Sequence, residues 1–530
     1  MARQTLARLI LEILAQRGVR YLFGVPGGGS SLDLIEAAGR AGIEFVLTRT
    51  ETAAALMAAV SGELGPAPGV VLTGIGPGAA SVVNGVAYAS LERAPLLVFT
   101  DGPASSLHQA FDQSALFAPI SKASLQLRPE TAVTTLAEAI HCALSLPQGP
   151  VHLNLSAEAA GAWIAEQPVE APAIPAADTE LHSLTRATEL FSSSRYPIII
   201  AGLDSRREDA PRALGELAQA LACPVLLSYK AKGVLADDSP YMAGLFTGAR
   251  LEIECLEHAD LIVFFGLDPV EVIPGHWPDL APVLNICTYT GHDYPLTPEG
   301  QLGGPLANSV NRLLSAAVPA SAWQPEDIHS LRETLRAPLI LGGSGHTAAS
   351  VVTALIASAP AGSRLCVDAG AHMFSAMGLW PAQQAYDVLK SNGLSTMGFA
   401  LPAAIASALL EPERPVIALT GDGGLLMCLA ELTTALARRC RITVLVINDG
   451  ALSLIDVKQQ RRQQPCNGVR YPAVDFAAAA RALGCAAWRV EPGDDLSSAL
   501  ALALACEGPS LVDVHVDASG YVNQLAALRG

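Results

Sequence analysis

The sequence predicts an α/β protein with three domains, each built on a mostly parallel sheet flanked by helices. The chain has 530 residues, well above the size of one typical domain. Hydrophobic residues make up 51% and charged residues 16%, which is enough apolar surface for large cores. Short apolar runs typical of buried strands alternate with helical stretches, and this alternation is the pattern of parallel sheets.

The first domain is expected at residues 1–165. Helical patterns separate its buried-strand candidates, which are residues 21–23, 45–47, 70–73, 96–99 and 151–153. A stretch rich in proline and alanine follows, with Pro168, Pro172 and Pro175, and it indicates a linker to the next domain.

Two further domains are expected at residues 183–318 and 340–530. The central domain has strand candidates at 198–202, 224–227 and 261–266, and a second linker surrounds Pro319 and Pro325. The last domain has strand candidates at 416–420 and 442–447.

Composition and charge exclude several classes of function. The formal net charge of -17 argues against a nucleic-acid surface and against an anionic membrane face. No signal-peptide pattern opens the chain, and no segment reaches the ~18 unbroken apolar residues of a membrane helix. The 10 cysteines are scattered without CxxC pairing, as is typical of core residues in a reducing compartment. We therefore expect a cytoplasmic enzyme.

Two small polar clusters follow the strand candidates of the last domain. They are Gly421-Asp422-Gly423-Gly424 and Asn448-Asp449-Gly450-Ala451. Parallel strands deliver such clusters to the sheet edge where α/β folds bind ligands. The glycines let backbone N–H groups approach a phosphate, and the Asp and Asn oxygens suit Mg²⁺ shared with a diphosphate. The alternative is a pair of ordinary turns after strands.

The two clusters resemble the thiamin-diphosphate (ThDP) motif, in which GDG is followed about two dozen residues later by NN. The resemblance implies that ThDP and Mg²⁺ are the cofactors. It implies that the cofactor is bound by Gly421, Asp422, Gly423, Gly424, Asn448, Asp449 and Ala451. The implied metal ligands are Asp422, Asp449 and the Ala451 carbonyl. Asp449 stands where the family has its second Asn, so it adds one negative charge beside the metal.

Glu51 is the candidate catalytic acid. It lies where a strand candidate becomes an Ala-rich helix, as does the glutamate that this family places against N1′ of the cofactor's pyrimidine. That contact promotes the imino form, whose 4′-nitrogen removes the C2 proton. Burial suits this role, because desolvation raises the pKa of a carboxyl group. The alternative is a carboxylate that stabilises a helix N-terminus.

Residues 394–402 resemble the family stretch that holds the cofactor bent. Met397 occupies the position of the bulky apolar residue that supports this shape. The Ser395 carbonyl is expected to accept a hydrogen bond from the 4′-amino group, although the family usually has Gly there. A core methionine at a helix start is the alternative for Met397. His372, in a stretch similar to GQHQM of acetolactate synthases, is expected near the diphosphate or as a buried structural histidine.

Two glycine-rich turns, residues 24–29 and 74–78, lack the full dinucleotide fingerprint and do not predict NAD binding. They resemble family loops that border the active-site cavity, and Gly28 is the candidate cofactor contact there. His108 and Gln109 lie in a stretch that resembles AFQE…DQ of the family. Gln109 is a candidate hydrogen-bond donor to substrate, and His108 a candidate proton relay with an ordinary pKa of about 6.5. The alternative for both is a solvent-facing loop.

The whole chain resembles the acetolactate synthase large subunit and the 2-oxoacid decarboxylases, with pyrimidine-binding, central and diphosphate-binding domains in that order. The resemblance implies decarboxylation of a 2-oxo acid such as pyruvate and ligation of the acyl unit to a second carbonyl compound. It implies a homodimer or homotetramer, because Glu51 and the metal site come from different subunits. The alternatives are a 2-oxoacid decarboxylase, an aldehyde lyase or carboligase, a 2-hydroxyacyl-CoA lyase and a non-catalytic ThDP-fold protein. Some acetolactate synthases bind FAD across the central domain, and the sequence leaves FAD open.

Overall fold

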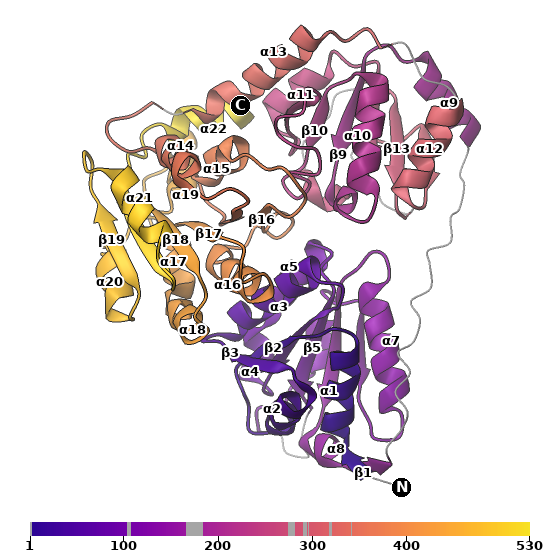
Figure 1. Ribbon diagram of the computed structural model, residues 1–530, viewed down its shortest axis with the longest axis vertical. Helices are drawn as coiled ribbons and strands as arrows, with labels where there is room; N and C mark the ends of the chain where they lie inside the picture. The colour runs from indigo at the N-terminus through magenta and orange to yellow at the C-terminus, as the bar shows by residue number, and fades with distance from the viewer. Residues whose placement is uncertain are drawn as a thin grey trace.

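The computed structural model describes residues 3–102, 108–165, 184–273, 281–289, 294, 296–316, 321–340 and 342–529. These residues form three six-stranded sheets, each with helices packed around it (Figure 1). All strand pairs within the three sheets are parallel, which confirms the predicted fold class. The linker residues Pro168, Pro172, Pro175 and Pro319 lie outside the described residues, as do the expected domain limits 1, 183, 318 and 530. The expectation that Pro325 lies in a linker was wrong, because this proline begins helix α13 (Pro325–Arg336).

The first sheet has the strand order β3-β2-β4-β5-β7-β6. Its strands are β2 (Tyr21–Gly24), β3 (Glu44–Leu47), β4 (Gly69–Thr73), β5 (Leu96–Asp101), β6 (Ala123–Gln126) and β7 (Pro150–Leu155). The helices are α1 (Leu6–Gln16), α2 (Ser30–Ala41), α3 (Glu51–Leu64), α4 (Pro77–Ser81), α5 (Val83–Leu91), α6 (Gln113–Phe117), α7 (Ala132–Leu144) and α8 (Ala157–Gly161). A separate antiparallel pair joins β1 (Arg3–Thr5) to β8 (Trp163–Ala165).

The second sheet has the order β11-β10-β9-β12-β13-β14. Its strands are β9 (Pro197–Ala201), β10 (Val225–Leu227), β11 (Met242–Leu245), β12 (Leu261–Phe265), β13 (Val283–Cys287) and β14 (Gly300–Gly303). The helices are α9 (Leu184–Ser193), α10 (Ala210–Leu221), α11 (Arg250–Leu256) and α12 (Leu306–Ala316), with short 3-10 helices η1 (Leu203–Arg206) and η2 (Pro269–Glu271).

The third sheet has the order β16-β15-β17-β18-β20-β19. Its strands are β15 (Arg364–Val367), β16 (Val388–Lys390), β17 (Val416–Gly421), β18 (Ile442–Asn448), β19 (Ala486–Val490) and β20 (Ser510–His515). Before it come α13 (Pro325–Arg336) and η3 (Ala337–Leu339). Its helices are α14 (Ala348–Ser358), α15 (Met373–Leu379), α16 (Ala400–Leu410), α17 (Asp422–Cys428), η4 (Leu429–Glu431), α18 (Leu432–Ala437), α19 (Ser453–Arg461), α20 (Phe476–Ala482), α21 (Leu496–Leu504) and α22 (Tyr521–Arg529).

The first and third sheets share one hydrophobic core. Helices α3 and α16 lie side by side (Figure 1), and buried residues of both belong to one apolar cluster. Both helices are rich in alanine, so their backbones approach closely without side-chain clashes. The rings of Tyr88 and Phe399 meet across the same contact with their centroids 5.1 Å apart. Burial of this apolar surface therefore fixes the first sheet against the third.

Among the described residues, no helix is both long enough and apolar enough to span a membrane.

Candidate active site

The two polar clusters meet at the carboxyl edge of the third sheet. Strands β17 and β18 are parallel neighbours, with Gly421 opposite Ile447. Asp422 begins α17, and its carboxylate accepts hydrogen bonds from the backbone N–H groups of Gly423 and Gly450, both at 2.8 Å. The second bond ties the first cluster directly to the turn that carries the second.

Two carboxylates of like charge lie together at this edge. Burial, and next the charge of Asp422, raise the pKa of Asp449 to about 7. Burial also raises the pKa of Asp422. A divalent cation between the two would stabilise their ionised forms. No three His, Cys, Asp or Glu side chains gather as a metal site in the described parts of the chain, so a cation here also needs backbone or phosphate oxygens.

The remaining residues of the second cluster have defined places. The N–H group of Ala451 donates to Asp449 Oδ1 at 3.2 Å, and this bond closes the turn. The bond does not involve the Ala451 carbonyl. Asn448 is buried, and its amide nitrogen donates to Asp513 on β20 at 2.9 Å. The Asn448 side chain is therefore anchored within the sheet.

Asp368, which the sequence analysis did not select, holds the turn of the first polar cluster in place. It follows β15, is fully buried, and accepts hydrogen bonds from the Thr420 hydroxyl at 2.9 Å and the Gly398 N–H at 3.0 Å. Its Oδ2 would lie 2.5 Å from a Cβ at position 424, so only glycine fits there without displacement. The sequence signal that could have identified Asp368 is its position directly after a strand.

The loop between β16 and α16 carries Ser395 and Met397. Ser395 has φ +53, in the left-handed region that glycine adopts without strain. The Cε atom of Met397 lies 3.4 Å from the position of a Cβ on Gly423. The structure therefore brings the Met397 side chain to the first polar cluster.

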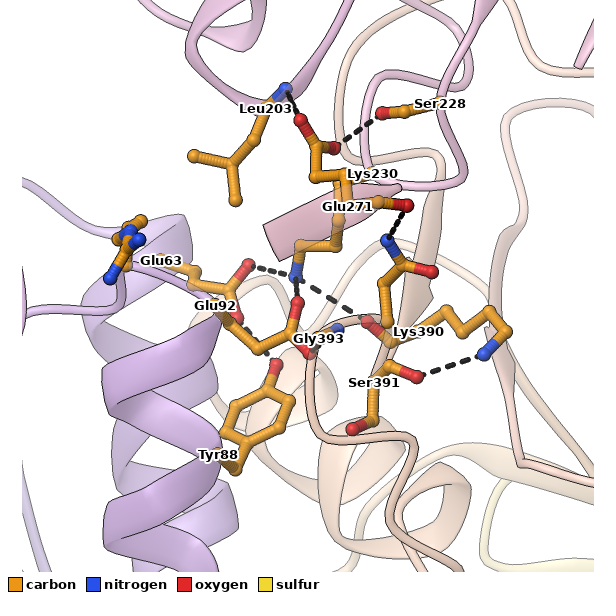
Figure 2. Close-up of polar contacts among 12 residues, drawn as sticks. Glu63, Tyr88, Glu92, Leu203, Ser228, Lys230, Glu271, Lys390, Ser391 and Gly393 are labelled. Atoms are coloured by element: carbon orange, nitrogen blue, oxygen red, sulfur yellow. Dashed lines mark hydrogen bonds and ion pairs between the residues drawn. The ribbon is translucent and has the colours of Figure 1, made fainter. Parts of the chain in front are cut away.

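Other domains hold this loop. The N–H group of Gly393 donates to the Glu92 carboxylate at 2.8 Å, and the Thr396 hydroxyl donates to Asn84 at 2.9 Å. Figure 2 shows Glu92 reaching from the first domain toward Gly393. The Lys230 ammonium, from the central domain, lies 3.4 Å from the Lys390 carbonyl at the start of the loop.

Lys230 is the centre of a buried ion network (Figure 2). Its Nζ atom lies 2.7 Å from Glu63 Oε2 and 3.3 Å from Glu92 Oε2, and all three side chains are at most 2% exposed. Arg206 makes a second ion pair with Glu63 at 3.0 Å. Burial alone would raise the pKa of Glu63, but Lys230 and Arg206 outweigh it and lower that pKa to about 2. These charges join all three domains behind the Met397 loop.

Glu51 is the first residue of α3, and the preceding Thr50 caps the helix by accepting a hydrogen bond from the Ala53 N–H at 3.1 Å. Its Oε1 atom lies 3.4 Å from the position of a Cβ on Gly78. The carboxylate is partly buried and has no hydrogen bond or ion pair with another described residue. The structure thus places Glu51 at the carboxyl end of β4, with free hydrogen-bonding capacity.

Gln109 lies beside the same edge of the first sheet. Its backbone carbonyl would be 2.6 Å from a Cβ on Gly76, two residues before Gly78, so the Gln109 loop and Glu51 flank one turn. His108 is solvent-exposed and next to Gln109. Gly28 faces open space, with nothing within 4 Å of a Cβ built there. These residues lie at the carboxyl edge of the first sheet, and no contact joins the His108 side chain to another predicted site residue among the described residues.

His372 packs beside the first polar cluster. Its ring lies 3.1 Å from the position of a Cβ on Gly421, and its Nε2 atom is buried without a hydrogen-bond partner in the described chain. Burial, and next Lys390, lower its pKa to about 3, so the imidazole is neutral. The Tyr521 hydroxyl is likewise buried without a hydrogen-bond partner in the described chain, whereas the Tyr471 hydroxyl lies beside Asp422, and burial followed by the charge of Asp422 raises the pKa of Tyr471. An acceptor such as a phosphate oxygen would satisfy these unpaired groups.

The carboxyl edge of the central sheet is filled by Glu271 (Figure 2). Its carboxylate accepts hydrogen bonds from the Leu203 N–H at 2.7 Å, the Asp268 N–H at 3.1 Å and the Ser228 hydroxyl. Its Oε2 would clash with a Cβ on Gly202. The Leu203 N–H follows β9, where a dinucleotide phosphate binds in α/β folds, and this donor is therefore taken by the chain's own carboxylate.

Three family profiles match the chain in succession. Residues 4–120 match "Thiamine pyrophosphate enzyme, N-terminal TPP binding domain", residues 184–286 match the central domain of the same enzymes, and residues 368–514 match "Thiamine pyrophosphate enzyme, C-terminal TPP binding domain". Together they cover more than half of the chain, and each falls on one of the three sheets.

Individual relatives are similar along nearly the whole chain. An acetolactate synthase of Bacillus subtilis (strain 168) is 27% identical over 98% of this chain and 94% of its own length. A catabolic acetolactate synthase of Raoultella terrigena is 29% identical over 96% and 95%. A probable 2-ketoarginine decarboxylase, AruI, of Pseudomonas aeruginosa is 28% identical over 96% and 94%.

Proposed function

We propose, from the premise that this chain belongs to the thiamine pyrophosphate enzymes, that it decarboxylates a small 2-oxo acid and ligates the acyl unit to a second carbonyl compound. The observation that carries the proposal is the carboxyl edge of the third sheet, where the Asp422–Asp449 pair and the Met397 side chain surround the glycine turn. The similarity to two acetolactate synthases supports ligation as the second step.

The residues present fit ThDP and a divalent cation. Asp422, Asp449 and the Ala451 carbonyl would hold Mg²⁺, and this role accounts for two acidic groups at one buried point. The N–H groups of the glycine turn, together with the unpaired His372 nitrogen, would bind the diphosphate. Bound ThDP supplies an electron sink for the pair released when a 2-oxo acid loses CO₂.

The pyrimidine end of the cofactor is assigned to four residues. Met397 would support the bent shape, the Ser395 carbonyl would accept a hydrogen bond from the 4′-amino group, and Gly28 would lie against the ring from the first domain. Glu51 would donate or share a proton at N1′, since it is the free carboxyl group at the edge of the first sheet. Gln109 and His108 are proposed to face the substrate.

We infer that the active enzyme is a homodimer or homotetramer. Glu51 has no partner within the described chain, so the proposal takes its cofactor contact from a second subunit. Two apolar side chains on α17, Leu426 and Met427, are 41% and 58% exposed, directly after the glycine turn. A second subunit that covers them would complete the site and bury this apolar surface.

The proposed holoenzyme contains no FAD. Glu271 occupies the backbone donors that a flavin dinucleotide phosphate needs, so the residues present do not fit that cofactor. A cytoplasmic location is part of the proposal and is supported by ten cysteines that are all free thiols.

A simple 2-oxoacid decarboxylase is the second candidate, because a similar relative is named a probable 2-ketoarginine decarboxylase. In that case the acyl unit is protonated instead of ligated. Product NMR after incubation with pyruvate, ThDP and Mg²⁺ separates the two. Acetolactate or acetoin supports ligation, and acetaldehyde alone supports the decarboxylase. Absence of turnover with pyruvate and with larger 2-oxo acids would refute both.

A further inference from the structure

A cavity of about 290 Å³ lies outside the candidate active site, where the central domain meets the third domain. Its lining comes from β11, α13, α15 and α22, and it contains none of the residues assigned to ThDP or the metal. The volume is close to the ~300 Å³ at which small-molecule pockets begin. Much of the wall is apolar and includes Met242, Leu335, Leu339, Phe374, Leu379 and Leu528.

The polar side chains of the cavity lining that can still form hydrogen bonds with a ligand are donors. Tyr229 is only 8% exposed and lines the cavity, and its hydroxyl has no hydrogen-bond partner among the described residues. The Arg529 guanidinium lies 5.2 Å from the ring centre of Phe374 and forms no ion pair with a described residue. Arg332 donates hydrogen bonds from two of its guanidinium nitrogens to the carbonyls of Met242 and Ser239, both at 2.7 Å. Its third guanidinium nitrogen can still donate to a ligand.

The acids of the lining, by contrast, already have partners. Glu252 accepts hydrogen bonds from the backbone N–H groups of Thr247 and Ala249, and the nearby charge of Arg529 favours its ionised form. Asp237 accepts from Lys232 at 2.7 Å and from the Ala382 N–H at 2.9 Å. Asp238 is solvent-exposed, where water and salt screen its charge. A ligand would therefore meet free donors beside an apolar wall.

The geometry points to a binding site for a small organic anion with an apolar body, such as an aliphatic or aromatic monocarboxylate. Its carboxylate accepts hydrogen bonds from Arg529 and Tyr229, and its hydrocarbon part packs against Phe374 and Leu335. Such a ligand fixes the end of α22, a nine-residue helix about 13 Å long. The other end of this helix begins at Tyr521, which is buried.

The test is calorimetric titration of the full chain, without ThDP or metal, with phenylacetate and with 4-methylpentanoate. The matching neutral probes are phenylacetamide and 4-methylpentanamide. Both acids are expected to bind with submillimolar dissociation constants and both amides far more weakly. Arg529→Met should weaken binding about tenfold or more, because a hydrogen bond to a charged group is lost. Tyr229→Phe should weaken binding about threefold or more by the loss of a neutral-donor bond.

Arg312→Met is the control, since Arg312 is exposed on α12 and distant from the lining. It should bind both acids as the wild type does. The proposal is overturned if neither acid binds, if the amides bind equally well, or if Arg529→Met and Tyr229→Phe both bind as the wild type. Circular dichroism establishes that the variants are folded. The titration uses no cofactor or substrate turnover, so its failure would leave the proposed function untouched.

Discussion

Replacing Lys230 by methionine removes the ammonium at the centre of the buried ion network. Two carboxylates, Glu63 and Glu92, then remain in the interior with less compensation, and Glu63 keeps its ion pair with Arg206 and its hydrogen bond from Tyr88. The folded-state pKa of Glu63 is lowered from 4.5 to about 2, mainly by Lys230 and Arg206 against the effect of burial. That shift corresponds to about 3 kcal/mol at neutral pH, and losing one partner of a buried pair costs about as much.

We therefore expect Lys230→Met to lower the free energy of unfolding by about 3 kcal/mol at pH 7. Because the pKa of Glu63 is depressed on folding, its contribution is present above 4.5 and is lost as pH falls toward 2. The difference between wild type and variant should thus shrink to about 2 kcal/mol near about pH 3.5. Urea unfolding of the cofactor-free protein, followed by tryptophan fluorescence, measures both values.

Lys458→Met is the matched control, because Lys458 is exposed on α19 and should change stability by less than about 0.5 kcal/mol. A loss below about 1 kcal/mol for Lys230→Met would refute the reasoning. So would a loss that stays constant between the two pH values, since it would not come from the ionised Glu63.

Three further predictions concern the proposed site and its cofactors. Glu51→Gln should lower kcat about 10²- to 10⁴-fold while ThDP still binds. Turnover assays measure kcat, and calorimetry measures ThDP binding. Unchanged turnover would show that Glu51 has no catalytic role. Asp449→Ala should weaken Mg²⁺-dependent ThDP binding about tenfold or more. Asp449→Asn keeps an oxygen ligand and should bind ThDP within about threefold of the wild type. Equal losses in both variants would contradict the ligand role of Asp449. The purified protein should be colourless and release no flavin on denaturation, because Glu271 fills the phosphate position; stoichiometric FAD would contradict that interpretation.

Much of the fold was predictable because its central strands are continuous apolar runs. Strands β4, β5 and β18 are buried along their lengths and β17 is buried up to Thr420, and this is the sequence pattern of parallel strands covered on both faces. Strand β6 was missed because its residues are polar or partly exposed at a sheet edge. Strand β14 contains two glycines in four residues, which conceals its strand character.

The candidate site was predictable where its residues follow strands as glycine and carboxylate clusters. Asp422 and Asp449 are of this kind, and the structure brings their turns together. The support behind the Met397 loop was not predictable, because it joins distant parts of the chain. Glu92 and Gly393 are separated by 301 residues, and no local pattern marks Glu92 as different from a surface acid. Only the packing of α5 against the third domain turns it into a buried acceptor.

The most direct test of the central claim is calorimetric titration of the cofactor-free protein with ThDP, with and without Mg²⁺, for the wild type and for Asp422→Ala. The claim is that the carboxyl edge of the third sheet holds the diphosphate through a divalent cation. We predict tight binding by the wild type with Mg²⁺, and a large loss either without the ion or in the variant. Binding that is indifferent to both Mg²⁺ and Asp422 would contradict the claim.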